Sequence, residues 1–251
     1  KPLLNLTIMK RKLPFIQTCM LIGTAAFLFA CKGSGGNADA GTAADSLASQ
    51  VDTTAAPAGP TVPFNAVVIR HTVADYDKWR PIFDADSTAR NQAGMHLINV
   101  SRGIDNPNDI NIPFMIEDVA KVKAFAADPR LKDVMQKGGV TGVPNVKLIN
   151  VLRMNEVATQ KGDYLEISHK VKDFNKWLQA FDGEGPATRS ADGLTDGVLA
   201  RGIEDTSMVY LVFAINDVAK AKAALANPAR QKLMMDAGVI GKPEIFFGRD
   251  Q

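Results

Sequence analysis

The chain has 251 residues, of which 46% are hydrophobic, and a formal net charge of +2 at neutral pH. This length allows one large domain or two small ones, and the nearly balanced charge gives no basic surface of the kind that binds nucleic acid. The two cysteines, Cys19 and Cys31, both lie near the N-terminus. The rest of the chain therefore excludes disulfides, thiolate metal sites and cysteine nucleophiles.

The first predicted element is a bacterial lipoprotein signal peptide over residues 9–30. A basic segment at residues 10–12 precedes an apolar one at 13–30, an order typical of secretory signals. The sequence Leu-Phe-Ala-Cys at 28–31 resembles a lipobox. We therefore expect lipidation of Cys31 and anchoring in the bacterial cell envelope, facing the periplasm or the cell surface. An uncleaved membrane anchor is the alternative, because the apolar segment approaches the length of a transmembrane helix.

A disordered tether is predicted for residues 31–63. This segment is rich in Gly, Ala, Ser, Thr, Asp and Pro and has few large apolar residues. It cannot bury enough surface to fold by itself. The tether would hold a globular part, residues 64–251, outside the cytoplasm.

The globular part contains one sequence pattern twice. The nine residues from His71 to Trp79 (HTVADYDKW) return from His169 to Trp177 (HKVKDFNKW), and GVTGVP at 139–144 returns as GVIGKP at 238–243. A repeat of this length is too long for one solenoid unit and fits a duplicated small domain. We assign residues 64–155 to a first repeat and residues 160–251 to a second.

Each repeat is predicted to have the order strand, helix, strand, strand, helix, strand. Alternating apolar residues indicate the strands, and Asp caps and helical spacing indicate the helices. In the first repeat these are a strand at 65–73, a helix from Asp75 to Gly94, strands at 95–103 and 110–117, a helix from Asp118 interrupted at Asp128-Pro129, and a strand at 146–152. This is the ferredoxin-like α+β unit, with both helices on one face of an antiparallel sheet. We expect the two sheets to cover each other, which makes the chain a monomer.

The repeated pattern also resembles a known family. His-x-Val-x-Asp-(Tyr/Phe)-x-x-Trp, followed by Arg90, Gly94, Arg102 and the GVTGVP motif, is similar to the dimeric α/β-barrel superfamily, in particular to antibiotic-biosynthesis-monooxygenase-like domains. The resemblance implies two tandem ferredoxin-like βαββαβ repeats that form an intramolecular dimeric α/β barrel. The superfamily includes cofactor-free oxygenases, isomerases, heme proteins and members without known activity, so it leaves the reaction open.

No cofactor and no metal are expected. Some duplicated barrels of this superfamily bind heme through a histidine on a helix, and the predicted helices of both repeats contain none. The three histidines fall in separate predicted strands and form no local metal-binding motif. A glycine-rich phosphate loop and a serine nucleophile elbow are also missing from the sequence.

The matched histidines and tryptophans are the first candidates for a site. His71 and His169 could act as general bases. Each could instead be a core histidine, hydrogen-bonded at the turn from strand to helix, because it shares the apolar face of its strand. Trp79 and Trp177 could wall an aromatic pocket or pack between helix and sheet.

Four matched arginines are the second candidates for a site, Arg90 with Arg189 and Arg102 with Arg201. They could hold the carboxylate or enolate of a ligand by paired hydrogen bonds. The alternative is a salt bridge to Asp84 or Asp182, or hydrogen bonds to carbonyls at a helix C-terminus.

Three positions differ between the repeats on the side expected to face the barrel, namely His96 against Thr195, Asn111 against Tyr210, and Pro113 against Val212. The two repeats would then have different cavities, one of which would have lost its ligand. Pro113 also lacks the N–H that a strand donates, which predicts an edge or a bulge.

Two functions of different class fit these features. The first is a cell-envelope lipoprotein that holds a small, partly apolar ligand or a partner in the barrel. The second is a cofactor-independent monooxygenase or isomerase acting on an aromatic or enolisable substrate, with His71 or His169 as base and an arginine pair holding the anion. A closed cavity lined by a histidine and an arginine would favour the enzyme, and a filled barrel would favour the accessory role.

Overall fold

A computed structural model gives the positions of residues 61–156, 159 and 162–251. The predicted signal peptide at 9–30, Cys31 and all but the end of the tether at 31–63 lie outside the described residues, so their roles stay predictions. No helix in the described part of the chain is long and apolar enough to cross a membrane.

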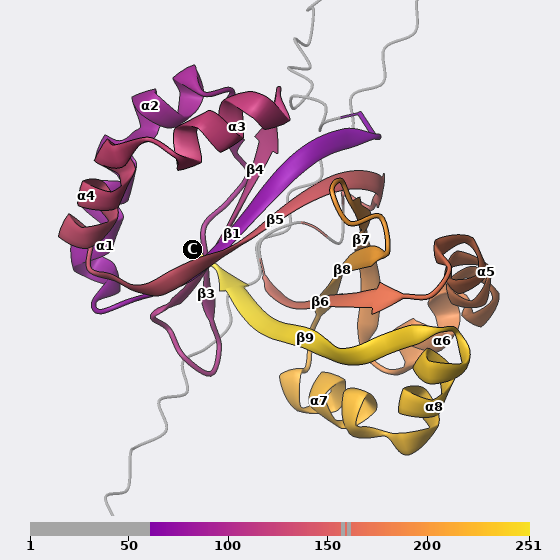
Figure 1. Ribbon diagram of the computed structural model, residues 1–251. Helices are drawn as coiled ribbons and strands as arrows, with labels where there is room; N and C mark the ends of the chain where they lie inside the picture. Colours follow the sequence, from indigo (N-terminus) through magenta and orange to yellow (C-terminus); the bar gives the residue numbers. More distant parts are fainter. Residues whose placement is uncertain (1–60, 157–158, 160–161) are drawn as a thin grey trace, which may run out of the picture. The chain divides into compact units, whose positions relative to one another are not determined.

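Both repeats have the predicted order of elements (Figure 1). The first contains β1 (Phe64–Val73), α1 (Tyr76–Ala85), α2 (Ser87–Gln92), β2 (Met95–Leu97), β3 (Ser101–Gly103), β4 (Asp109–Ile116), α3 (Val119–Ala126), α4 (Pro129–Lys137) and β5 (Val140–Met154). The second contains β6 (Asp163–Val171), α5 (Phe174–Glu184), α6 (Pro186–Ala191), β7 (Leu194–Gly202), β8 (Met208–Ile215), α7 (Val218–Ala226), α8 (Pro228–Asp236) and β9 (Val239–Asp250). Because β2 and β3 together correspond to β7, each repeat is a βαββαβ unit.

Short polar side chains begin the helices as the sequence predicts. Asp75, Asp118 and Asp128 each accept hydrogen bonds from backbone N–H groups in the first turn of α1, α3 and α4. Their counterparts Asp173, Asp217 and Asn227 do the same for α5, α7 and α8. Each cap satisfies N–H groups that have no partner within the helix, which stabilises the helix start by about 1 kcal/mol.

The first helical segment of each repeat is split in two, where one continuous helix up to Gly94 or Gly193 was predicted. In the second repeat, Gly185 has a φ of 77°, a conformation that glycine adopts readily, and Pro186 then begins α6. In the first repeat, Asp86 takes the non-helical position between α1 and α2. The break lets an arginine of the short helix reach back to the end of the long one.

Three predicted strands also differ in their bounds. Residues 98–100 separate β2 from β3, and the pairing with β4 slips by one residue across this gap. Pro113 of β4 lies opposite the gap, where its missing N–H predicted a bulge. β5 and β9 begin at Val140 and Val239, earlier than predicted, because the glycine-rich segment pairs with the end of β1 or β6.

The strands of both repeats form one closed antiparallel barrel, the intramolecular dimeric α/β barrel that was predicted. Hydrogen-bonded neighbours follow the order β1-β5-β7-β8-β6-β9-β3-β4, and β4 pairs with β1 to close the ring. The repeats join where β5 pairs with β7 and β9 pairs with β3. Helices α1–α4 lie outside the barrel on one side and α5–α8 on the other (Figure 1).

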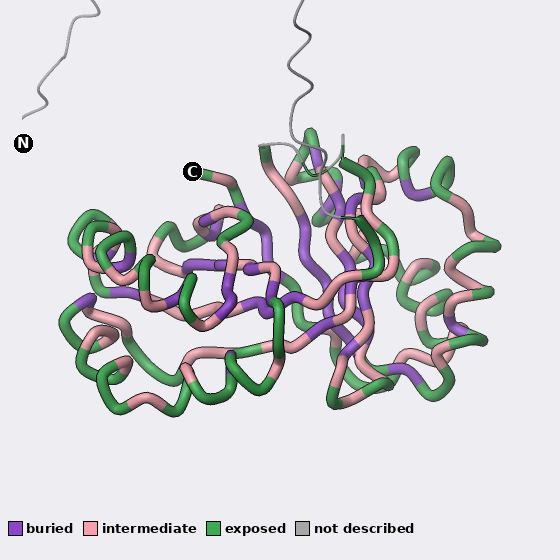
Figure 2. Tube along the Cα trace, turned by 90° about the horizontal axis from the view of Figure 1, so that it is seen from above, coloured by how far each residue is buried: buried purple, intermediate pink, exposed green. Residues whose placement is uncertain are grey.

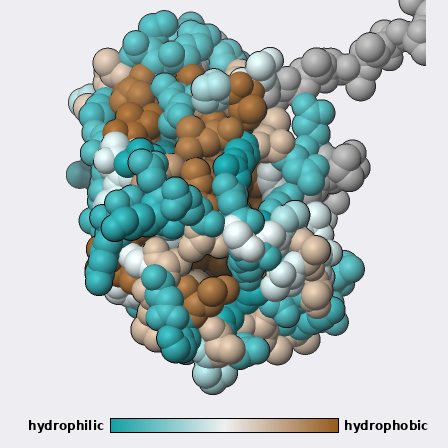
Figure 3. All heavy atoms as spheres, turned by 90° about the vertical axis from the view of Figure 1, so that its right-hand side faces the viewer, coloured by the Kyte–Doolittle hydropathy of each residue, from teal (hydrophilic) through white to brown (hydrophobic). Residues whose placement is uncertain are grey.

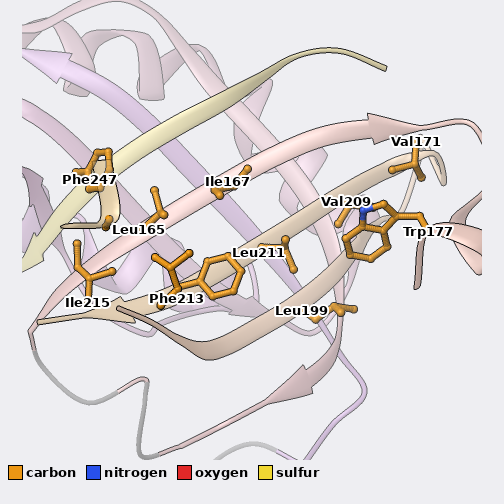
Figure 4. Packing of buried hydrophobic residues seen from close by; sticks show 12 residues of the cluster. Leu165, Ile167, Val171, Trp177, Leu199, Val209, Leu211, Phe213, Ile215 and Phe247 are labelled. Carbon is orange, nitrogen blue, oxygen red and sulfur yellow. The ribbon is translucent and has the colours of Figure 1, made fainter. Parts of the chain in front are cut away.

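Buried side chains gather in three groups. Each repeat has an apolar core between its helices and its sheet, and Figure 4 shows that of the second repeat, with side chains of β6 and β8 on one face of the sheet together with Trp177. The third group lies inside the barrel and consists of Ala66, Val68, Ile149, Val151, Ala200 and Tyr210. Burial follows the strands, whereas the outer sides of the helices are exposed (Figure 2). On the side of the second repeat, apolar patches lie between polar side chains (Figure 3).

Candidate functional site

The first repeat has a cavity of about 260 Å³ between its helices and its sheet, which we call the first helix–sheet cavity. Its lining includes His71, Trp79, Phe83, Asp86 and Arg90, together with apolar side chains of α3, α4 and β5. The equivalent space in the second repeat, the second helix–sheet cavity, measures only about 60 Å³. The two repeats have therefore diverged at equivalent places around matched residues.

The matched histidines lie on the walls of these cavities. Each ring packs edge-on against the tryptophan of its helix, with centroids 5.7 Å apart for His71–Trp79 and 5.6 Å apart for His169–Trp177. The ring nitrogens of both histidines have no hydrogen-bond partner among the described residues. The prediction of a hydrogen-bonded histidine at the turn is therefore wrong, because the ring packs on a tryptophan instead. Burial lowers the pKa of each histidine to about 4, so both rings are neutral at pH 7.

The matched tryptophans connect the first helix of each repeat to its sheet. Trp79 stacks on Phe83 with ring centroids 4.7 Å apart, and Trp177 stacks on Phe181 at 5.2 Å. Both indoles are buried, and each also lines the helix–sheet cavity of its repeat. Each tryptophan therefore has both of the roles that were given as alternatives: it packs in the core and it forms part of a cavity wall.

The matched arginines of α2 and α6 differ in their partners. Arg189 donates hydrogen bonds of 2.7 and 2.6 Å to Asp196 and a third, of 2.8 Å, to a carbonyl at the end of α5. Arg90 donates one, of 2.8 Å, to the equivalent carbonyl of α1 and lies 3.7 Å from Asp86. The counterpart of Asp196 is Leu97, so within the described residues Arg90 lacks a bidentate carboxylate. Burial lowers the pKa of Arg90, a penalty that a bound anion would offset.

Ion pairs close the second helix–sheet cavity. Arg230 of α8 lies 2.7 Å from Glu184 and 2.5 Å from Asp192, and so ties α8 to the ends of α5 and α6. The first repeat has Leu131 at the position of Arg230, and no ion pair within the described ranges ties α4 to α1 or α2. The described part of the first repeat therefore lacks the ion pairs that connect α8 to α5 and α6 in the second.

Arg102 and Arg201 lie away from both helix–sheet cavities. Each donates a hydrogen bond to a carbonyl of its own hairpin, at 2.6 and 2.5 Å, and each guanidinium lies over an aromatic ring at the start of α1 or α5. Asp84 and Asp182, the expected carboxylate partners, pair with other arginines. The predicted salt bridge is therefore wrong, because the hairpin turns its own carbonyl groups towards the arginine.

A polar cluster inside the barrel was not predicted from the sequence. It consists of Ser101, Asn111, Tyr164, Glu166 and Tyr210, four of which are at most 3% exposed. One signal in the sequence could have revealed it: equivalent positions of the two repeats, such as Asn111 and Tyr210, hold different polar residues on the side expected to face the barrel. Ala66, Val68 and Ala200 occupy the positions equivalent to Tyr164, Glu166 and Ser101. Asn111 and Tyr210 line one lumen that both sheets share, whereas the cavities that differ between the repeats lie between helices and sheet.

Comparison with known proteins bears on the fold. No family model matches the sequence, and no curated protein is similar to it in sequence. An anthrone oxidase-like protein of solved structure is 15% identical with a TM-score of 0.50, over 75% of this chain and 92% of that one. The chain has the fold of the monooxygenase-like dimeric α/β barrels. A monooxygenase-like protein from Listeria innocua aligns with a TM-score of 0.44 at 12% identity, over 73% of this chain and 93% of that one. A ferredoxin-fold protein from Listeria monocytogenes, related to antibiotic biosynthesis monooxygenases, aligns with a TM-score of 0.43 at 9% identity, over 75% of this chain and 95% of that one.

The first helix–sheet cavity combines an apolar wall with two kinds of polar group. His71 offers ring nitrogens that can donate or accept a hydrogen bond, and Arg90 offers a permanent charge with several N–H donors. This combination suits a small apolar ligand that carries an anionic or acceptor group. Within the described residues, no group of three or more His, Cys, Asp or Glu side chains is placed to hold a metal ion.

Proposed function

We propose that this protein is a lipid-anchored lipoprotein of the bacterial cell envelope whose first helix–sheet cavity binds a small, partly apolar ligand. The observation that carries the binding role is the difference in volume between two equivalent cavities, about 260 Å³ against about 60 Å³. The same histidine, tryptophan and arginine line both helix–sheet cavities. Packing these residues in the fold therefore does not by itself require the larger cavity of the first repeat.

The second repeat shows which chemical group the arginine at this position binds. The Asp196 carboxylate accepts two hydrogen bonds from the Arg189 guanidinium, the geometry in which a guanidinium binds an anion most strongly. Arg90 has no such partner in the described part of the chain, and it lines the cavity. The ligand we propose therefore carries a carboxylate or an enolate that takes the place of the missing aspartate, and its apolar body lies against Trp79 and α4.

Binding of 1-naphthoate to the full chain, measured by isothermal titration calorimetry, tests this proposal. Arg90→Met should weaken binding at least about tenfold, because hydrogen bonds to a charged group contribute ~1.5–3 kcal/mol. Val134→Phe, which fills the first cavity from α4, should have a similar effect. The matched control is Leu233→Phe in α8, at the equivalent position of the second repeat.

The expected pattern is loss of binding in the two first-repeat variants and none in Leu233→Phe, with thermal melts showing that all three remain folded. Binding that persists in Val134→Phe, or that is lost equally in Leu233→Phe, would remove the first helix–sheet cavity as the site. If Arg90→Met alone fails to fold, Val134→Phe still decides the question, because it leaves every polar group in place.

A second candidate is a cofactor-independent monooxygenase or isomerase, favoured by the presence of His71 and Arg90 in one cavity. His71 would remove a proton from an enolisable substrate, and Arg90 would hold the enolate. A pKa of about 4 leaves His71 unprotonated at pH 7 but a weak base, which is why we place binding first. The similarity to an anthrone oxidase-like protein suggests anthrone as the probe. Oxygen uptake that the full chain supports and His71→Phe abolishes would put the enzyme first.

A further inference from the structure

The barrel encloses a cavity of about 520 Å³, larger than the first helix–sheet cavity and separate from it. The interior of an eight-stranded barrel is just wide enough for side chains to fill it or for one small ligand. Small side chains line much of this one, among them Ala66, Val68, Val198 and Val212. They leave a volume within the range of small-molecule sites.

Hydrogen-bond directions in the polar cluster of the lumen can be assigned. Ser101 Oγ donates to the main-chain carbonyl oxygen of Asn111 at 3.2 Å, so Tyr164, 2.5 Å from Ser101, donates its hydroxyl hydrogen to Oγ. Asn111 Nδ2 donates to the Tyr164 oxygen at 3.1 Å and to Glu166 Oε2 at 2.9 Å. The Tyr210 hydroxyl donates to the same Glu166 oxygen at 2.5 Å. Every hydroxyl and amide hydrogen of the cluster is therefore used.

One acceptor in this cluster has no partner among the described residues. Asn111 is 2% exposed and lines the lumen, and its Oδ1 accepts no hydrogen bond there. Burial raises the pKa of Tyr164 and Tyr210, so both hydroxyls are neutral at pH 7 and their hydrogens are already donated. Buried acceptors are nearly always satisfied, because leaving one unpaired is costly. The missing donor must come from outside this cluster.

We propose that the barrel lumen is a second ligand site, which takes a small neutral alcohol or phenol whose hydroxyl donates to Asn111 Oδ1. The apolar wall fits the hydrocarbon part of such a molecule. An anionic group has no hydrogen to donate, so it would leave Asn111 Oδ1 unpaired. A cation would lose its hydration without gaining a charged oxygen of its own, since the carboxyl oxygen nearest Asn111 already accepts two hydrogen bonds.

The lumen reaches the surface at one end. Leu97 and Ile98 line it and are 42% and 51% exposed, at the place where β2 gives way to β3. This opening coincides with the slip in the β2–β4 pairing opposite Pro113. His96 and Asn99 line this end beside the two apolar side chains, so it admits a molecule that is mainly apolar and carries a polar group, which agrees with the class inferred from the interior.

Two probes that differ only at the hydroxyl test this site on the full chain. 1-Naphthol can donate a hydrogen bond, and 1-methoxynaphthalene has the same ring system but cannot. Calorimetry should show 1-naphthol binding at least about tenfold more tightly, because the ether leaves Asn111 Oδ1 unpaired. Asn111→Leu should bring the two affinities to within about threefold of each other, because it removes the acceptor.

Cavity-filling variants locate the binding. Val212→Phe fills the lumen without removing a polar group and should weaken 1-naphthol binding at least tenfold, even if Asn111→Leu fails to fold. Val134→Phe fills the first helix–sheet cavity and should leave 1-naphthol binding unchanged while it removes 1-naphthoate binding. Equal affinity for the two probes in the parent chain would overturn the proposal, because the acceptor is then satisfied by water. Loss of 1-naphthol binding in Val134→Phe but not in Val212→Phe would also overturn it and leave the proposed function standing.

Discussion

Replacing His169 by phenylalanine tests whether the matched histidines are buried without hydrogen bonds. Both ring nitrogens of His169 lack a partner among the described residues, and the residue is 4% exposed. Phenylalanine keeps the ring contact with Trp177 and removes two buried polar atoms, and the adjoining cavity of about 60 Å³ accepts its larger ring. We expect His169→Phe to retain or increase the free energy of unfolding at pH 7. A hydrogen-bonded histidine would instead lose ~1–3 kcal/mol on this change.

The same variant should change how stability depends on pH. The pKa of His169 is about 4 in the folded chain and 6.5 ordinarily, so below pH 6.5 the unfolded chain binds a proton that the folded chain does not. Acid therefore favours unfolding, and between pH 7 and pH 5 this one group lowers the free energy of unfolding by about 2 kcal/mol. Phenylalanine binds no proton, so the loss should be about 2 kcal/mol smaller in His169→Phe.

Urea unfolding of the parent and of His169→Phe at both pH values measures this difference, with His71→Phe as the matched variant of the first repeat. Glu166 and Asp109, whose pKa values burial raises, oppose the loss, but they contribute equally to parent and variant. An unchanged pH dependence, or a loss of about 1 kcal/mol or more at pH 7, would show that His169 is hydrogen-bonded in the folded chain. Either result would refute the reasoning.

Further predictions concern the anchor, the repeat and one turn. Cys31→Ser should move the chain from the membrane to the soluble fraction on cell fractionation, because acyl chains supply the anchor; an unchanged membrane fraction would contradict the lipobox. Light scattering should show residues 64–251 as a monomer and residues 64–155 as a dimer or aggregate, because an apolar sheet face is left uncovered; a monomeric single repeat would count against the barrel's role. Thermal melts should show that Gly183→Ala in α5 stabilises by about 0.5 kcal/mol and that Gly185→Ala, where φ is 77°, destabilises by about 1 kcal/mol.

The barrel was predictable because its determinants are local or repeated. Asp75 and Asp173 show the same cap at the same place in both repeats, and the duplication supplies a second sheet that covers the first. The break between α1 and α2 was not predictable from the first repeat, where Asp86 gives no strong signal. Gly185-Pro186 in the second repeat did give one, since proline after a left-handed glycine begins a new helix.

The site was less predictable than the fold, for a physical reason. Matched residues such as Arg102 are held by their own hairpin, and a carbonyl partner cannot be read from side-chain types. Glu166 stands on a strand face that is polar in its own repeat, and only the sheet of the other repeat makes that face an interior. Its burial depends on contacts between the two halves of the barrel, which no local pattern records.

A barrel built from two identical chains would place each lumen residue in the same interior as its own copy. A carboxyl group at the position of Glu166 would then share the lumen with a second one at the position of Val68, and two buried carboxyl groups repel each other. Duplication within one chain removes this constraint. One repeat supplies Glu166 and Tyr164, and the other supplies the donor amide of Asn111.

The helix–sheet cavities follow the same logic. Asp196 binds one buried arginine with both carboxylate oxygens, whereas Leu97 at the equivalent position leaves Arg90 with only the more distant Asp86, 3.7 Å away, among the described residues. In identical subunits both arginines would have a partner or neither would. The two proposed ligand sites therefore share one origin: a position that differs between the repeats leaves a buried polar group of one copy, Arg90 or Asn111, without the partner that a bound molecule would supply.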